Sequence, residues 1–328
     1  TGISIRLMSA ARSLELELVF TRYAFADVLE PARIVVEADG ARHVVDLADT
    51  DGEVLRDDTL RREPSVVTPT RLRFQLASTP EPRLIVVRLS QAAATQIVAV
   101  RADARLVPDR SPTRPLWLHH GSSISHGTNL PDPESPWPIR AAAALGVQVI
   151  NASFSGNALL DPFVAEAMSR RRVDVATFEV GINVVNWDSH IARTFVPALH
   201  GFLDRFRAEW PCLPMAVISP LHCPVHEHHP GPIEIDDQGF ARACAQPRPD
   251  ALDLTAVREL IETVVAVRDD PLLDVVDGRS LLGPAEEDLL TDGLHPGEAG
   301  TALIAERFAG LVRDAASPLG HAFAEVLR

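Results

Sequence analysis

Apolar and polar residues alternate with a period of two through the first hundred residues. In residues 13–18 Ser, Leu, Glu, Leu, Glu and Leu follow one another, which is the pattern of a strand with one buried face. The turn dipeptide Asp39-Gly40 separates two similar runs at 33–37 and 42–47. Further runs of this kind lie at 71–76, 83–89 and 96–100. Short strands with turns between them predict a β-sandwich, jelly-roll-like domain over residues 1–106.

The pattern changes after a proline-rich stretch at 107–115, which we interpret as a linker. Beyond it, short apolar runs alternate with segments of helical length. The apolar runs lie at 116–119, 148–151, 175–180, 215–218 and 272–276, and the helical segments at 138–145, 162–171, 191–209, 254–268 and 298–313. This alternation predicts an α/β domain over residues 116–328, with a parallel sheet covered by helices on both faces.

Composition and charge exclude several classes of function. The chain contains 31 basic residues, all of them arginine, so mechanisms that need a lysine, such as a pyridoxal Schiff base, are excluded. A net charge of −14 repels phosphate backbones, and we therefore expect no nucleic-acid partner. Apolar runs stay far below the ~18 residues of a membrane helix, and no signal-peptide pattern is visible. We therefore expect a cytoplasmic protein with no membrane partner.

Polar residues with catalytic potential follow several of the predicted strands. Ser123 comes after the first strand of the α/β domain, Gly156 after the second and Asn183 after the third. Asp292 and His295 lie beyond the last strand, just before the final helix. Ligands of open α/β sheets bind beyond the carboxyl ends of the strands, so we expect these residues to meet at one edge of the sheet.

These residue types are the ones that an acyl-transfer site needs. Serine is a poor nucleophile unless a nearby base takes its proton, and His295 can act as that base for Ser123. Asp292 can hold the second ring nitrogen of the histidine. The backbone N–H groups of Ser123 and Gly156, together with the Asn183 amide, can stabilise the oxyanion of a tetrahedral intermediate.

Four ordered segments carry a resemblance to a known family. They are Gly-Ser-Ser-Ile at 121–124, Ser-Gly-Asn at 155–157, Gly-Ile-Asn-Val at 181–184 and Asp-Gly-Leu-His at 292–295. Together they resemble the signature blocks of the SGNH (GDSL-type) hydrolases over residues 116–315. The resemblance implies a flavodoxin-like sheet and a Ser123, His295 and Asp292 triad, with no metal or cofactor. Two positions depart from the family pattern, because Ser122 and Val184 stand where aspartates are usual.

The sequence of the first block and the β-domain before it resemble those of a bacterial subgroup of two-domain GDSL enzymes. This subgroup includes an acyltransferase that modifies a polyketide. This resemblance implies an acyl-enzyme on Ser123 whose acyl group passes to a hydroxyl of a small-molecule or glycosylated natural product. The partners would be a small-molecule acyl donor, such as acyl-CoA or another activated donor, and an alcohol acceptor. With water as acceptor, the same residues would form a carboxylesterase or O-deacylase. A non-catalytic binding protein is a more distant alternative.

Five further residues are candidates for the substrate pocket. Phe163 and Trp187 follow the glycine and asparagine blocks and could line an aromatic acyl pocket, although simple packing would also account for them. Leu294 lies inside the Asp-Gly-Leu-His block, and His222 and Cys223 begin a Pro- and His-rich excursion.

The Pro- and His-rich excursion spans residues 221–252 and is too long for a plain connection. We expect it at the rim of the pocket. Its histidines lack the C-x-x-C or H-E-x-x-H pattern of a zinc site, so we expect no metal there. The β-domain has three possible roles: a structural partner, a carbohydrate-binding module, or a wall of the active-site cleft. We favour the wall because the aromatic residues available to stack on sugars are few: Phe20, Tyr23, Phe25 and Phe74.

Overall fold

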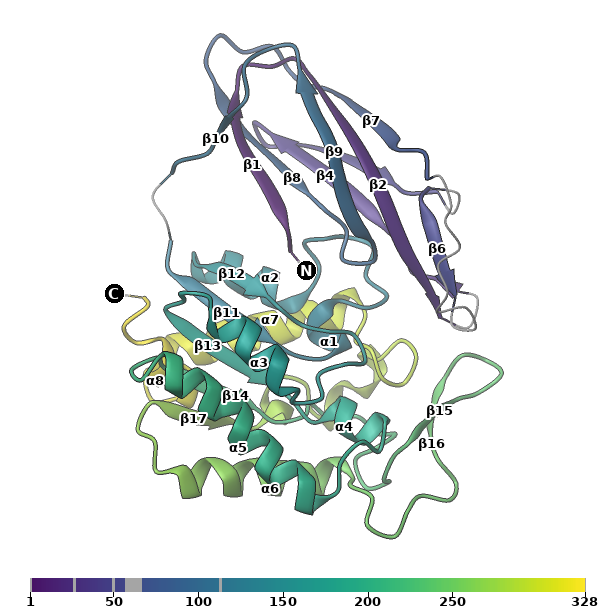
Figure 1. Ribbon diagram of the computed structural model, residues 1–328, viewed down its shortest axis with the longest axis vertical. Coiled ribbons are helices and arrows are strands. Elements are labelled where there is room, and N and C mark those ends of the chain that lie inside the picture. The colour runs from purple at the N-terminus through teal and green to yellow at the C-terminus, as the bar shows by residue number, and fades with distance from the viewer. Residues whose placement is uncertain (1, 26–27, 49–50, 57–66, 112–113, 328) are drawn as a thin grey trace. The chain divides into compact units, whose positions relative to one another are not determined.

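The computed structural model describes residues 2–25, 28–48, 51–56, 67–111 and 114–327, and the chain forms two compact units (Figure 1). Unit 1 comprises Thr1–Thr113 and Thr128–Ser135, and unit 2 comprises Arg114–Gly127 and Pro136–Arg328. Each unit has its own hydrophobic core, as expected for an independently packed domain.

Unit 1 contains two β-sheets. In the first, neighbouring strands are antiparallel and follow the order β10 (Val107–Pro108), β1 (Ser4–Ser9), β8 (Arg83–Arg88), β4 (Arg33–Ala38) and β5 (Ala41–Asp46). The second is built on the long strand β2 (Ser13–Phe25), which pairs antiparallel with β3 (Val28–Leu29), β7 (Thr70–Gln75) and β9 (Ala94–Ala102), and parallel with β6 (Glu53–Arg56).

The alternating pattern of β2 explains why the two sheets pack face to face. Its apolar side chains, including Leu16 and Phe20, are buried and pack with Ile34 and Val87 of the other sheet. The intervening glutamates form ion pairs with arginines of β7 and β9. The predicted β-sandwich is therefore confirmed. Phe20 and Phe74 belong to its core, so neither offers a surface for stacking on a sugar.

The Asp39-Gly40 turn between β4 and β5 has the backbone that its sequence predicts. Both residues have positive φ, +52° for Asp39 and +73° for Gly40. Two successive left-handed residues characterise the type I′ turn, whose twist matches that of the flanking strands. The hairpin register from Arg33↔Asp46 to Ala38↔Ala41 follows from this turn.

The limits of unit 1 differ from the predicted boundary in two places. Val107 and Pro108, assigned to the linker, form β10 and pair with Met8 and Leu7 of β1. A proline is tolerated there because an edge strand needs only one hydrogen-bonding side. In addition, residues 128–135, assigned to the second domain, belong to unit 1.

Ion pairs and one side-chain hydrogen bond hold residues 128–135 in unit 1. Arg42 of β5 pairs with Asp132, and Arg88 of β8 binds Glu134 at 3.0 Å. The Gln91 side-chain amide also donates to the carbonyl of Leu130. The chain therefore leaves unit 2 after Gly127 and returns to it at Pro136. A local sequence pattern does not show this exchange, because these contacts join positions about 40 to 90 residues apart.

Unit 2 contains a five-stranded parallel sheet in the order β12 (Gln148–Asn151), β11 (Leu116–His120), β13 (Val175–Glu179), β14 (Met215–Ile218) and β17 (Leu273–Val276). Counted within this unit, the order is 2-1-3-4-5, which is that of flavodoxin-like folds. The predicted α/β class and parallel sheet are confirmed. The order reverses beside β11, so the sheet edge after this strand is the expected place for a site.

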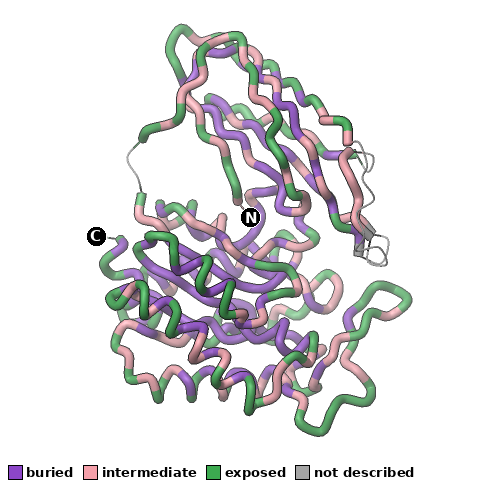
Figure 2. The backbone as a smooth tube through the Cα atoms, in the orientation of Figure 1, coloured by how far each residue is buried: buried purple, intermediate pink, exposed green. Residues whose placement is uncertain are grey.

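Helices cover both faces of this sheet. The helices α2 (Trp137–Leu145), α7 (Glu298–Arg313) and α8 (Pro318–Phe323) share one core with the sheet, and α3 (Pro162–Ser169), α5 (Ala192–Glu209) and α6 (Leu254–Arg268) share the other. The strands are buried between them, and the outer helix faces are exposed (Figure 2). Short elements complete the unit: α1 (Ser123–His126), α4 (Ile182–Asn186), the hairpin β15 (Ile233–Ile235) and β16 (Ala241–Ala243), and two 3-10 turns at Gly278–Ser280 and Pro284–Leu289. Among the described residues, no helix combines the length and apolarity needed to cross a membrane.

The aromatic cluster around Phe308 of α7 should contribute strongly to the stability of unit 2. Phe308 is fully buried and stacks on Trp117 with ring centroids 4.8 Å apart. We expect Phe308→Ala to lower the free energy of unfolding by about 3–5 kcal/mol, because it leaves a cavity in the core. Denaturant unfolding followed by tryptophan fluorescence measures this loss, since the four tryptophans of the chain all lie in unit 2. Phe163→Ala is the matched control, since Phe163 is 69% exposed, and an equal loss in both variants would contradict the expectation.

Candidate active site

Ser123, His295 and Asp292 form one continuous hydrogen-bonded group. The Ser123 hydroxyl lies 2.8 Å from Nε2 of His295, and Nδ1 of His295 lies 2.7 Å from Oδ2 of Asp292. A carboxylate can only accept, so Nδ1 carries the proton and Nε2 is free to accept the proton of the serine. The three residues therefore have the geometry of a nucleophile, a base and a group that orients the base.

Asp292 also holds the backbone of the loop that carries His295. Its second oxygen, Oδ1, accepts the backbone N–H groups of Leu294 at 3.0 Å and His295 at 2.7 Å. Burial alone would raise the pKa of Asp292, but the bonds from the His295 ring and from these two N–H groups lower the pKa to about 2. The group is therefore a carboxylate throughout the neutral range, as the orienting role requires.

Ser123 is the first residue of the short helix α1, directly after β11. The side chain of Ser122 caps this helix by accepting the Ile124 N–H at 3.3 Å, and Gly127 ends it with a φ of +91°. Strand, sharp turn and helix follow one another within a few residues, so the serine lies beyond the carboxyl end of the strand. Only 5% of its surface is exposed.

Asn183 lies in α4, beyond the end of β13, and its amide orientation is fixed. Its Oδ1 accepts the backbone N–H of Ala158 at 3.0 Å. Its Nδ2 is buried and has no partner among the described residues. Gly181 starts this turn with a φ of +118°, and a Cβ there would lie 2.6 Å from Val257. The turn therefore presents one amide N–H₂ group that is free for a ligand.

Gly156 lies in the loop after β12, and bonds from both neighbouring blocks hold this loop. The Phe154 N–H donates to the carbonyl of Gly121 at 3.0 Å, and the indole N–H of Trp187 donates to the carbonyl of Gly156 at 2.6 Å. The φ of Gly156 is +70°, a left-handed conformation that favours glycine. The serine, glycine and asparagine blocks are thus joined into one structure at the sheet edge.

The structure places the five candidate pocket residues in two different environments. Phe163 and Trp187 are 69% and 56% exposed, so neither is a core residue. Cys223 and Leu294 are buried in the core shared with α5 and α6, and His222 is buried between Glu227 and Glu287. The contact of His222 and Cys223 with a substrate stays a prediction.

The 221–252 excursion contacts the loop that carries His295. The backbone N–H of Ala241 in β16 donates to the carbonyl of Asp292 at 3.1 Å, and the Cys223 thiol lies 3.8 Å from the carbonyl of Gly293. Sequence reasoning missed Ala241, because an alanine carries no chemical signal and acts here through its backbone. Among the described residues, no group of His, Cys, Asp and Glu side chains has the arrangement of a metal site.

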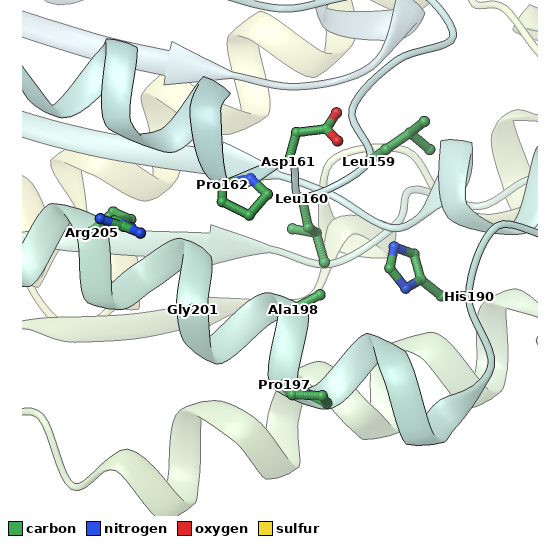
Figure 3. A pocket seen from close by; sticks show the side chains of 9 residues that line it. All are labelled: Leu159, Leu160, Asp161, Pro162, His190, Pro197, Ala198, Gly201 and Arg205. Atoms are coloured by element: carbon green, nitrogen blue, oxygen red, sulfur yellow. The ribbon is translucent and has the colours of Figure 1, made fainter.

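A separate hollow of about 390 Å³ lies between the start of α3 and α5 (Figure 3). Leu160, Asp161, His190 and Arg205 are among its lining residues. The lining does not include Ser123, Asp292 or His295, so the hollow is separate from the candidate site. Its lining includes residues 159–162, which follow Gly156 in the chain, and His190, which follows Trp187.

The comparison with protein families identifies the second unit. The model of the GDSL-like lipase/acylhydrolase family matches residues 120–303, which is more than half of the chain and contains all five residues of the predicted site. The chain belongs to this family. The expected enzyme class, a GDSL-type serine acyltransferase or ester hydrolase, is thereby confirmed. No curated protein matches the sequence.

Solved structures share the fold of this GDSL-family chain over almost its whole length. The salicylyl-acyltransferase SsfX3 from a tetracycline biosynthetic pathway has a TM-score of 0.74 at 21% identity, covering 93% of this chain and 80% of its own. An active-site mutant of a family two carbohydrate esterase from Clostridium thermocellum has a TM-score of 0.65 at 12% identity, covering 96% and 92%. An acetyl xylan esterase from Butyrivibrio proteoclasticus has a TM-score of 0.61 at 11% identity, covering 95% and 90%. These likenesses extend across both units.

Asp292→Asn should separate the orienting role of this residue from its support of the loop. The amide oxygen keeps the bonds to the N–H groups of Leu294 and His295, but the amide nitrogen faces Nδ1 of the ring and opposes the reactive tautomer. We expect kcat for an aryl ester to fall by about 10⁴-fold with little change in KM. The exposed Asp288, changed to Asn, is the control. Retention of more than a tenth of the activity by Asp292→Asn would argue against the assigned role.

Replacing Asn183 should weaken stabilisation of the oxyanion. We expect Asn183→Ala to lower kcat by about 10²–10³-fold, since one preorganised donor is lost. Asn183→Asp keeps an acceptor for the Ala158 N–H but has no donor, and it should lose at least as much. Steady-state kinetics of both variants distinguish the donor from the acceptor function. Full activity in Asn183→Asp would show that the free N–H₂ group is not used.

Proposed function

We propose that this protein is a serine acyltransferase that forms an acyl-enzyme on Ser123 and passes the acyl group to a hydroxyl of a small-molecule or glycosylated acceptor. The observation that carries the proposal is the continuous bonding of Ser123, His295 and Asp292 at 2.8 and 2.7 Å. The donor would be acyl-CoA or another activated small-molecule acyl compound. The chemistry needs no cofactor, because the protein supplies base, acid and oxyanion donors.

In the first half-reaction, the Ser123 oxygen forms a bond to the acyl carbonyl carbon while its proton moves to Nε2 of His295. The carbonyl electrons move to the oxygen. This oxyanion is held by the N–H groups of Ser123 and Gly156 and by Nδ2 of Asn183, which has no partner among the described residues. When the bond to the leaving group breaks, His295 returns the proton to it. Asp292 remains ionised and stabilises the imidazolium that forms between these steps.

In the second half-reaction, the acceptor hydroxyl gives its proton to Nε2 of His295 as its oxygen attacks the acyl carbon. The tetrahedral intermediate collapses, the Ser123 oxygen leaves, and His295 protonates it. An alcohol acceptor gives a new ester, and water gives a free acid. The two outcomes use the same protein atoms, so the choice depends on how well the acceptor site binds an alcohol and excludes water.

Two observations support a substrate with a ring-shaped group, in the acyl donor or in the acceptor. Trp187 presents an indole that is 56% exposed while its N–H is bound to the carbonyl of Gly156, one residue position of the oxyanion site. Such a fixed and exposed ring is suited to stacking against a flat or cyclic substrate. The name of the similar salicylyl-acyltransferase also refers to an aromatic acyl group. The carbohydrate esterases with the same fold keep hydrolysis of an O-acyl sugar as the second candidate.

Intact-mass spectrometry with an aryl-ester donor tests the proposal. We expect a single acyl adduct on the wild-type protein that is absent from Ser123→Ala, because hydrolysis of an acyltransferase intermediate is slow. Adding an alcohol acceptor, such as an aryl glycoside, should discharge the adduct and yield ester in excess of free acid. Ser111→Ala is the control, since Ser111 is exposed and lies in unit 1.

Two other outcomes would decide for the alternatives. Rapid release of free acid at a rate that the alcohol does not change, again absent from Ser123→Ala, would identify a carboxylesterase or O-deacylase. Equal behaviour of the wild type and Ser123→Ala, with neither adduct nor turnover, would favour a non-catalytic binding protein.

A further inference from the structure

Glu179, the last residue of β13, is a fully buried carboxyl group bound to the turn that carries the nucleophile. Its Oε2 accepts the backbone N–H of Ser122 at 2.9 Å and the Ser122 hydroxyl at 2.8 Å. The same oxygen accepts the hydroxyl of Ser125 at 3.2 Å. Ser122 and Ser125 lie on either side of Ser123 in the sequence. One carboxyl oxygen therefore holds both flanks of the nucleophile.

The turn is built closely around this carboxyl group. A Cβ on Gly121 would lie 2.8 Å from Oε2 of Glu179 and 2.6 Å from Oγ of Ser125, so only glycine leaves room for the bonds. The other oxygen of Glu179, Oε1, is buried without a partner among the described residues. Burial raises the pKa of Glu179 to about 7, against the lowering effect of the bonds from Ser122 and Ser125. Burial of a carboxyl group costs free energy, and such groups are common at functional sites. The position of Glu179 beside Ser123 therefore indicates a functional role.

Further bonds orient the Ser125 hydroxyl toward Glu179. Because Ser125 donates its proton to the carboxyl oxygen, Trp137 Nε1 and His119 Nε2 both donate to the Ser125 oxygen, at 3.0 and 2.9 Å. An indole N–H can only donate, which agrees with this direction. Burial lowers the pKa of His119 well below its usual value, so the ring is neutral and its Nδ1 is an acceptor.

The chain of bonds continues in the same direction on the far side of His119. The Thr177 hydroxyl lies 2.8 Å from Nδ1 of His119, and it accepts the indole N–H of Trp117 at 2.8 Å. Thr177 therefore donates to His119, His119 to Ser125, and Ser125 to Glu179. Every proton in this buried chain points toward the carboxyl group, which is its final acceptor. A fully oriented chain of this kind is stiff, because no member can rotate without leaving a buried group unpaired.

We propose that Glu179 is a positioning residue for the nucleophile: its carboxyl oxygen, acting as a hydrogen-bond acceptor, fixes Ser122 and Ser125 and thereby the hydroxyl and the oxyanion-binding N–H of Ser123. This inference rests on the proposed acyl-enzyme function. The carboxyl group beside the nucleophile thus comes from the neighbouring strand, whereas the residue preceding Ser123 is a serine. Because the Ser123 N–H belongs to the peptide that Ser122 begins, a shift of Ser122 would move that donor directly.

Two substitutions of Glu179 separate its acceptor function from its charge. Glu179→Gln keeps a carbonyl oxygen for Ser122 and Ser125, and we expect kcat within about threefold of the wild type. Glu179→Met keeps the length of the side chain but leaves the donors of Ser122 and Ser125 unpaired. We expect kcat to fall by about 10- to 100-fold, since small errors in placing reacting groups have effects of this size. KM should stay within about twofold, because substrate binding in the ground state is unaffected.

A tetrahedral inhibitor gives a readout that a general loss of packing would not move. An aryl boronic acid forms a tetrahedral adduct with a reactive serine and places an oxygen in the oxyanion site. We expect its inhibition constant to rise in Glu179→Met by the same factor by which kcat falls. Val264→Ala is the control: Val264 of α6 is equally buried in the core of unit 2, but it takes no part in this chain of hydrogen bonds. We expect it to lower the melting temperature with kcat close to that of the wild type.

The experiment distinguishes a failure of the positioning role from a failure of the proposed function. If the wild type shows no turnover that depends on Ser123, the proposed function itself is wrong. If it does, and Glu179→Met keeps its kcat and inhibitor affinity, the positioning role is wrong. A loss in Glu179→Gln equal to that in Glu179→Met would overturn the acceptor role in favour of the charge. If Glu179→Met does not fold, Ser122→Ala removes one of the three donors, and an unchanged kcat in that variant would likewise overturn the proposal.

Discussion

The 2.8 Å hydrogen bond between Ser123 and His295 joins residues that lie 172 positions apart in the chain. Neither residue has catalytic value alone, because serine needs a base and the base needs an orienting group. The parallel sheet makes the contact possible: it brings the segments after its strands to one edge, with Ser123 after β11 and His295 just before α7. The two cores of unit 2 hold the helices that fix these segments.

The loops at this edge are fixed mainly by backbone groups. The carbonyls of Gly121, Gly156, Asp292 and Gly293 each receive a bond from another segment of unit 2, and Asp292 uses one of its two oxygens to hold its own loop. This explains why an unremarkable residue such as Ala241 supports the site. It also explains why the 221–252 excursion, which contains the hairpin β15–β16, belongs to the architecture of the site although its histidines take no part in the triad.

Several polar side chains are buried beside the turn that carries Ser123, and their desolvation lowers stability. Glu179, His119 and Thr177 are fully buried, and groups of this kind destabilise a core unless their bonds are satisfied. Here they form an oriented chain that ends at the nucleophile turn, which gives rigidity where the chemistry requires it. Unit 1 is stabilised in a different way. An apolar core lies between its two sheets, and ion pairs join β2 to β7 and β9.

Local periodicity and short motifs were sufficient to predict the class of both units and to single out Ser123, Asp292 and His295 as the candidate triad. The predicted helices 254–268 and 298–313 and the strands 148–151 and 215–218 have the observed bounds. Four features are visible only in the fold: residues 128–135 belong to unit 1, Pro108 joins a sheet, Cys223 and Leu294 are buried in a core, and Glu179 and Ala241 bond to the loops of the candidate site. Each of these depends on a contact between distant positions, and burial or a backbone bond made at a distance leaves no periodic trace in the chain.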